Sequence, residues 1–252
     1  MTEAYVTTTL HNHIATIEFF HPQGNSLPSQ LLEKLAQAIH GAGNDTEVKV
    51  VVLRSAGDKA FCGGASFDEL TAIKDEEEGF RFFSGFAHVI NAMRTCPKFI
   101  IARVQGKCVG GGVGLAAAAD YAIAMEPAEV KLSELAIGIG PFVVGPAVER
   151  KIGASAFSQL AIDAHMWRNG DWARRKGLFA ELHPNTEGMD ESISRLANSL
   201  ALSSAEAMKE LKAILWKGTE HWETLLPQRA TISGRLILGS AAKNAIQNLR
   251  KK

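Results

Sequence analysis

The chain has 252 residues, of which 46% are hydrophobic and 21% are charged, and its 27 Lys and Arg balance its 27 Asp and Glu. This composition excludes a disordered, collagen-like or coiled-coil protein. A net charge of zero gives no field that would attract nucleic acid or an anionic membrane, so we expect neither as a partner. The length is sufficient for one large core or two small ones.

The cysteines and the apolar segments indicate the compartment. Cys62, Cys96 and Cys108 are an odd number without close pairing, which favours a reducing environment over a disulfide framework. Residues 1–5 lack the basic and apolar regions of a signal peptide. The longest charge-free apolar run, 135–148, is shorter than the roughly 18 residues of a membrane-spanning helix. We therefore expect a cytoplasmic protein.

The first part of the chain predicts a strand pair, a helix and a buried strand. Residues 5–10 and 14–19 are β-rich runs around a short polar break, which is typical of a hairpin. Apolar residues then recur at helical spacing from Pro28 and stop at Gly41, which predicts an amphipathic helix. Residues 48–53 form a continuous apolar run, as expected of a strand that is buried on both faces.

The following segments continue the alternation of helices and strands. A helix predicted over 79–94 precedes a buried strand over 99–104, and a glycine cluster follows that strand. A short strand is predicted over 121–124, and beyond residue 155 the chain is mostly helical. Alternating strands and helices, followed by helices alone, predict an α/β fold with a helical C-terminal region.

Three glycine-containing segments carry the candidate chemistry: 60–70, 106–119 and 131–141. The backbone N–H groups of two glycine turns can converge on one oxygen atom, and a helix N-terminus adds positive partial charge to that point. The pair of turns, with a single carboxylate downstream, indicates an oxyanion hole. Either turn alone is more often a tight connection.

The glycine cluster also fits a dinucleotide-binding fingerprint. Residues 112–117 match G-x-G-x-x-A, and Glu134 lies 20 residues beyond Gly114. However, only about two helical turns fit between these glycines and the next predicted strand, whereas a crossover connection needs a dozen or more residues. We therefore do not expect a dinucleotide cofactor.

Other polar candidates are interpreted as structural. His11 and His13 form a close pair without a third ligand nearby, so we expect no metal site. Cys62 has no neighbouring His in the sequence and is expected to be a small buried residue rather than a nucleophile. Asp120 is expected to satisfy local backbone groups, and the isolated His165 is assigned to the core or the surface.

The chain resembles the crotonase, or enoyl-CoA hydratase/isomerase, superfamily in four ordered segments: 14–35, 48–70, 97–124 and 133–138. This resemblance implies a crotonase-like spiral of ββα units that binds an acyl-CoA thioester, with coenzyme A as part of the substrate and no separate cofactor. It also implies a core with the acyl-CoA site over 1–195. A C-terminal helical region over 196–252 would assemble a homotrimer or a dimer of trimers.

The resemblance also implies roles for individual residues. Ala65 and Gly111 would present the backbone N–H groups that hold the thioester oxygen, and Glu134 would be the general acid and base. The stretch from Ala65 to Asp68 would line the adenine end of coenzyme A. The implied substrate-binding and CoA-binding residues are Ala65, Ser66, Phe67, Asp68, Gly111 and Gly114.

Three positions depart from the family pattern. Gly114 replaces the first glutamate of family hydratases, which we expect to open space for a water, a bound anion or a substrate carboxylate. Ser66 stands where the family usually has Asp, and residues 240–252 lack the usual Gly and Phe of the last helix.

These departures bear on the reaction, because hydration usually divides its tasks between two carboxylates whereas one base can move a double bond through an enolate. We therefore favour isomerisation. Hydration of an enoyl-CoA, including branched or carboxylated ones, and a catalytically silent CoA-binding protein are the alternatives.

Overall fold

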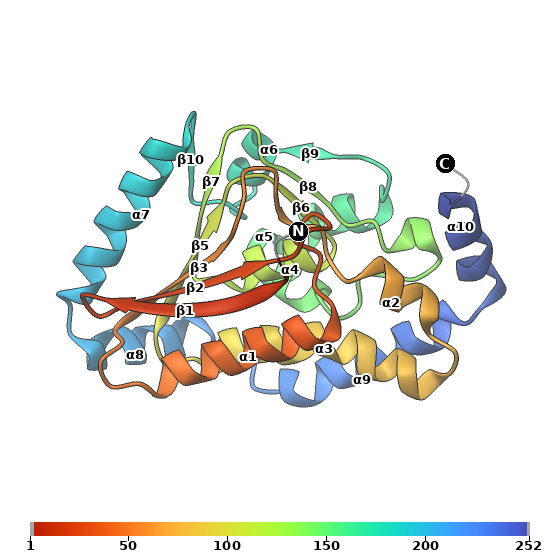
Figure 1. Ribbon diagram of the computed structural model, residues 1–252, viewed down its shortest axis with the longest axis horizontal. Helices are drawn as coiled ribbons and strands as arrows, with labels where there is room; N and C mark the ends of the chain where they lie inside the picture. The colour runs from red at the N-terminus through yellow and green to blue at the C-terminus, as the bar shows by residue number, and fades with distance from the viewer. Residues whose placement is uncertain (1–2, 251–252) are drawn as a thin grey trace.

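The computed structural model describes residues 3–250, which form two sheets and the helices that cover them (Figure 1). The six-stranded sheet has the order β1-β2-β3-β5-β7-β10, and the four-stranded sheet has the order β4-β6-β8-β9. The strands of the larger sheet are β1 (Tyr5–His11), β2 (Ile14–Phe20), β3 (Val50–Ser55), β5 (Phe99–Val104), β7 (Tyr121–Met125) and β10 (Glu181–His183). The strands of the smaller sheet are β4 (Ala60–Cys62), β6 (Lys107–Val109), β8 (Glu129–Lys131) and β9 (Arg168–Asn169).

Helices follow most of the strands along the chain. They are α1 (Ser29–Asn44), α2 (Phe67–Ala72), α3 (Glu76–Thr95), α4 (Gly111–Ala118), the 3-10 helix η1 (Leu135–Ile137), α5 (Gly145–Ile162), α6 (Gly170–Arg175), α7 (Thr186–Ala201), α8 (Ala205–Leu215), α9 (Trp222–Ile237) and α10 (Ser240–Arg250). The predicted α/β class with a helical C-terminal region is therefore confirmed.

Two predicted boundaries are wrong. Helix α1 continues past Gly41 to Asn44, because the Asp45 N–H still donates to the Gly41 carbonyl 3.0 Å away. Strand β3 begins two residues later than expected, since the Val48 N–H donates instead to Asp45 O in a turn. Beyond residue 155 the chain is mostly helical, as predicted, and α5 already begins at Gly145.

The six-stranded sheet separates two hydrophobic layers, and β3 shows how alternation assigns its residues to them. Val51 and Leu53 lie in the main core, whereas Val50 and Val52 belong to a second cluster on the other face. Helix α7 covers that second face, where its residue Ile193 packs in the same cluster (Figure 1). The core of the protein thus lies mainly between the two sheets and helices α1, α3 and α4.

The last helices pack onto the body of the chain. Helix α9 lies along α3 (Figure 1), and the two cross closely enough that a Cβ on Gly79 would lie 2.7 Å from Gly234 Cα. Helix α10 packs on η1, where a Cβ on Gly138 would lie 2.7 Å from Ala242 N. The predicted boundary at residue 195 stays a prediction. Among residues 3–250, no helix has the length and apolar character needed to cross a membrane.

Candidate active site

Two glycine turns meet at the carboxyl ends of neighbouring strands. Strands β4 and β6 pair in parallel, with Cys62 opposite Cys108, so the segments that follow them leave the sheet side by side. Gly64 has φ +91°, and a Cβ on it would lie 2.9 Å from Val109 O. Only glycine therefore fits this contact without strain. The two glycine turns therefore lie in contact, and the convergence of their N–H groups on one oxygen atom stays a prediction.

The turns leave two backbone N–H groups free. Leu27 N donates to Gly64 O at 2.8 Å, and Ser66 N donates to Leu27 O at 3.3 Å, so the intervening Ala65 N–H points away from residue 27. Gly111 is the first residue of α4, whose opening N–H groups have no partner within the helix. Within the described part of the chain, neither Ala65 N–H nor Gly111 N–H donates to a protein acceptor. Both residues line one cavity.

Glu134 lines the same cavity. The residue as a whole is partly exposed, but its Oε2 atom is buried without a hydrogen-bond partner among the described residues. Its Oε1 atom lies against Gly110, where an added Cβ would be 3.0 Å away. Burial raises the pKa of the Glu134 carboxyl to about 7, because an apolar environment disfavours its charged form. This carboxyl can therefore both take up and release a proton near neutral pH.

The cavity has a volume of about 320 Å³ and a mostly apolar wall. Helix α3 supplies three aromatic side chains to it. One of them, Phe86, packs against the second glycine turn, because a Cβ on Gly111 would lie 2.1 Å from its ring. Such a wall suits a hydrocarbon chain placed next to the free N–H groups. The aromatic lining residues are Phe67, Phe82, Phe83, Phe86 and Phe142.

The residues from Ala65 to Asp68, which we expected to bind coenzyme A, differ in whether they line the cavity. Phe67 lines the cavity, whereas Ser66 and Asp68 do not. The Ser66 hydroxyl caps α2 by accepting from Glu69 N at 3.3 Å, and Asp68 accepts from Gln23 Nε2 at 3.2 Å on the exposed side. The contacts of Ser66 and Asp68 with coenzyme A stay predictions.

The expectation of open space at Gly114 is wrong. A Cβ added there would lie 2.7 Å from Val144 Cγ1 and 2.9 Å from Val144 Cβ, so the volume is already filled. Gly114 lies in the buried α4 and does not line the cavity. Val144, whose side chain fills this volume, lines the cavity instead. The role of Gly114 in substrate binding stays a prediction, and no contact of Gly114 with the cavity supports it.

The sequence did not identify several polar residues of this cavity. His165 was assigned to the core or the surface, but it lines the cavity from the loop between α5 and β9, and Ser233 does so from α9. Both residues are far from the glycine turns along the chain, and the sequence around neither residue contains a motif that would have predicted a place in the cavity. Lys131 and Ser133 also line the cavity, and they flank Glu134 within the segment already singled out.

Two residues interpreted as structural lie outside the cavity. Cys62 is buried, as expected, and burial raises the pKa of its thiol to about 12, so the thiol stays protonated near neutral pH. Asp120 accepts from Ile100 N at 2.8 Å and pairs with Lys212 Nζ at 2.8 Å. It therefore bonds to backbone as expected, but its partners are distant in the sequence.

Over residues 3–250, no three His, Cys, Asp or Glu side chains are grouped as metal ligands would be.

Comparison with solved structures identifies the fold. The crystal structure of an enoyl-CoA hydratase from Bacillus halodurans matches with a TM-score of 0.89 at 23% identity, over 97% of this chain and 99% of that one. A structure from Legionella pneumophila described as a putative enoyl CoA hydratase/isomerase (crotonase) matches all of this chain and 98% of that one, with a TM-score of 0.80 at 26% identity. The chain therefore has the crotonase fold, as predicted.

Sequence comparison then gives the family. The family model for enoyl-CoA hydratase/isomerase matches residues 9–240. A probable enoyl-CoA hydratase of Bacillus subtilis is 27% identical over 241 residues, which cover 95% of this chain and 93% of the relative. The human mitochondrial methylglutaconyl-CoA hydratase is 31% identical over 201 residues, or 78% of this chain and 58% of the relative. The chain belongs to the enoyl-CoA hydratase/isomerase family.

Proposed function

We propose that this acyl-CoA enzyme moves a carbon–carbon double bond in an enoyl-CoA thioester, with Glu134 as its single acid and base. The observation that carries the proposal is that Glu134 supplies the only carboxyl lining the cavity in the described part of the chain. Val144 fills the volume beside Gly114, so no second carboxyl fits there without repacking. One carboxyl is sufficient when the same group removes and returns the proton.

The proposed mechanism passes through an enolate. The thioester oxygen accepts hydrogen bonds from the Ala65 and Gly111 N–H groups while Glu134 removes a proton from one carbon of the allylic unit. Negative charge then rests on the thioester oxygen, where each preorganised donor contributes about 3 kcal/mol in comparable sites. Glu134 returns the proton at the other end of the unit. Its pKa of about 7 suits both transfers, because neither form is strongly disfavoured at neutral pH.

Hydration of an enoyl-CoA is the second candidate. It is favoured by His165, which lines the cavity together with Glu134 and Lys131 and could hold a water molecule, and by the relatives that are named as hydratases. A silent CoA-binding protein is the third possibility. It would have no use for a buried, unpaired carboxyl, which is costly to keep in a folded protein.

Assembly as a homotrimer or a dimer of trimers belongs to the same proposal. Large apolar side chains are exposed near the ends of α5, α7 and α8, and Leu202 is the extreme case at 89% exposure. A large contiguous patch of exposed apolar surface marks an interaction site, and we place the contacts between subunits at these segments. Light scattering on the purified protein measures the state. The other exposed apolar residues of these segments are Ile162, Met166, Leu211, Ile214 and Leu215.

We place the protein in the cytoplasm, which the three buried free cysteines suit. The reaction itself is tested with purified protein and cis-3-, trans-3- and trans-2-enoyl-CoA esters of several lengths. Formation of a trans-2-enoyl-CoA from a 3-enoyl ester, faster than any 3-hydroxyacyl-CoA from a trans-2 ester, is the result expected. Faster formation of the 3-hydroxyacyl product would instead establish hydration and a water held by another group.

A further inference from the structure

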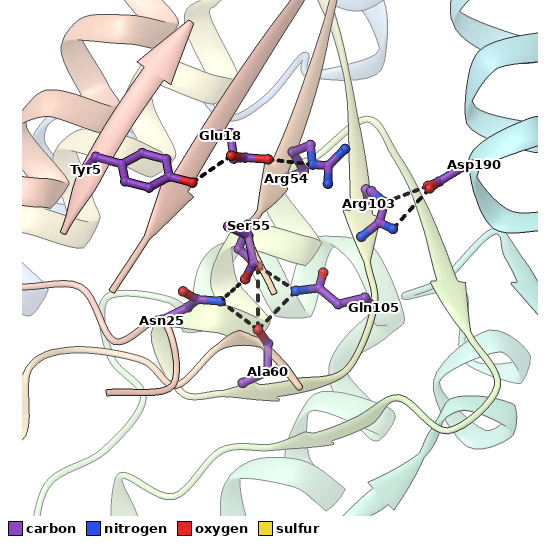
Figure 2. Close-up of polar contacts among 10 residues, drawn as sticks. Tyr5, Glu18, Asn25, Arg54, Ser55, Ala60, Arg103, Gln105 and Asp190 are labelled. Carbon is purple, nitrogen blue, oxygen red and sulfur yellow. Dashed lines mark hydrogen bonds and ion pairs between the residues drawn. The ribbon is translucent and has the colours of Figure 1, made fainter. Parts of the chain in front are cut away.

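Three side chains converge on the carbonyl of Ala60, the first residue of β4 (Figure 2). Asn25 Nδ2 donates to Ala60 O at 2.9 Å, Gln105 Nε2 donates at 3.1 Å, and the Ser55 hydroxyl lies 3.5 Å away. Gln105 Nε2 also donates to Ser55 Oγ at 2.8 Å. This carbonyl opens the short strand that leads to Ala65, so the strand's starting point is fixed by side chains outside the cavity.

Asn25 uses its whole amide in this arrangement. Its Nδ2 donates also to Ala56 O at 2.9 Å, and its Oδ1 accepts from His21 N at 3.0 Å. The residue is 4% exposed and adopts φ +54°, a conformation that Asn tolerates better than most residues. Asn25 therefore ties its own turn to both ends of the loop between β3 and β4.

The same turn pairs with the segment that carries the proposed oxyanion donor. Gly63 N donates to Gly24 O at 3.0 Å, and Leu27 N donates to Gly64 O at 2.8 Å. Ser66 N then donates to Leu27 O, which leaves the Ala65 N–H as the unbonded group between two bonded neighbours. The orientation of that N–H is thus set by the position of residues 24–27, and Asn25 lies within this stretch.

We infer that Asn25 is a positioning residue for catalysis, which acts by holding the Ala65 N–H toward the thioester oxygen. The inference rests on the proposed function, because it needs an oxyanion at this point. Asn25 itself does not line the cavity, so it acts only through backbone geometry. Displacement of a catalytic group by about 1 Å can cost on the order of 100-fold in rate, so a small shift of the 24–27 turn would be measurable.

The test separates the side chain's hydrogen bonds from its backbone conformation. Asn25→Gly keeps the positive φ and removes every side-chain bond, whereas Asn25→Asp keeps the size and the Oδ1 acceptor but removes both donations to carbonyls. Asn12→Gly, at an exposed residue with φ +49° in the β1–β2 hairpin, is the matched backbone control. Ile193→Ala, in α7 on the far side of the sheet, controls for lost stability.

Two readouts are needed, the steady-state constants and the absorption of a bound conjugated dienoyl-CoA. Hydrogen bonds to the thioester oxygen of such a ligand polarise the chromophore and shift its absorption to longer wavelength. We expect Asn25→Gly and Asn25→Asp to lower kcat by about 10- to 100-fold with KM changed by less than about threefold. We also expect a smaller spectral shift in both variants and an unchanged shift in both controls.

Several results would overturn the inference. A kcat and a spectral shift like those of the wild type in a folded Asn25 variant would do so, as would an equal kcat loss in Ile193→Ala. If Asn25→Gly does not fold, Asn25→Asp decides alone by the same criteria. A wild-type protein that binds the dienoyl-CoA with a large shift but converts no enoyl-CoA would refute the proposed function while leaving the positioning role supported by the spectra. No shift in the wild type would refute both.

Discussion

Replacement of Glu134 by Gln is predicted to stabilise the folded protein at neutral pH while removing its activity. The folded protein holds the Glu134 proton up to a pKa of about 7, against an ordinary value of 4.5. Between these values the folded state binds more protons than the unfolded state, so the free energy of unfolding falls as the pH rises through this window. At about 1.4 kcal/mol for each pH unit, the loss reaches about 3 kcal/mol above pH 7.

Urea denaturation of the wild type and of Glu134→Gln between pH 4 and pH 8 measures this effect. The difference in unfolding free energy should be smallest below pH 4.5 and should grow by about 3 kcal/mol in favour of the variant by pH 8. Glu47→Gln, at an exposed carboxylate, controls for the loss of one negative charge. A difference for Glu134→Gln that is constant across the range would refute a pKa raised by burial.

Three further predictions test other parts of the account. Ala65→Pro deletes the donor N–H and should lower kcat by at least about 100-fold, whereas Ala65→Gly keeps the N–H and should leave kcat within about tenfold of the wild type. Equal losses of kcat in the two variants at equal stability would contradict the assignment of this donor. Gly114→Ala should cost about 1–3 kcal/mol of unfolding free energy by overpacking against Val144, and Val144→Ala in the same chain should recover part of it. Lys212→Met should lower the free energy of unfolding, measured by thermal or urea denaturation, by about 3–5 kcal/mol, because it leaves the buried Asp120 carboxylate without its cation. A loss under about 1 kcal/mol would show that the hydrogen bonds from Ile100 N and Trp216 Nε1 are enough to stabilise this carboxylate.

The sequence is informative where chemistry is local. Two β-rich runs around a short polar break predict β1 and β2, and the buried strand predicted over 99–104 has the bounds of β5. Glycines at the ends of β4 and β6 are required by close backbone contacts, so their positions in the sequence point directly to the site. Glu134 was identified differently, as the single carboxylate downstream of the two turns and as the acid and base that the family resemblance implies.

The sequence is less informative where packing between distant segments decides. The filling of the space at Gly114 by Val144 depends on how α5 lies against α4, and no pattern within either helix indicates it. His165 reaches the cavity only because its loop folds back beside the glycine turns. Phe82, Phe83 and Phe86 were easier to find from the sequence, because all three lie on one predicted helix. Their spacing indicates an apolar face of that helix, but it does not show that this face lines a cavity.

The central claim is that Glu134 moves the proton while backbone N–H groups hold the thioester oxygen. The most direct measurement compares the wild type with Glu134→Gln in the conversion of a cis-3-enoyl-CoA, together with the Kd of each protein for a dienoyl-CoA. We predict that kcat falls by about 100- to 10,000-fold in the variant, while Kd and the spectral shift of the bound ligand stay within about threefold. Turnover of Glu134→Gln at a rate like that of the wild type would contradict the account, because another residue would then have to carry the proton.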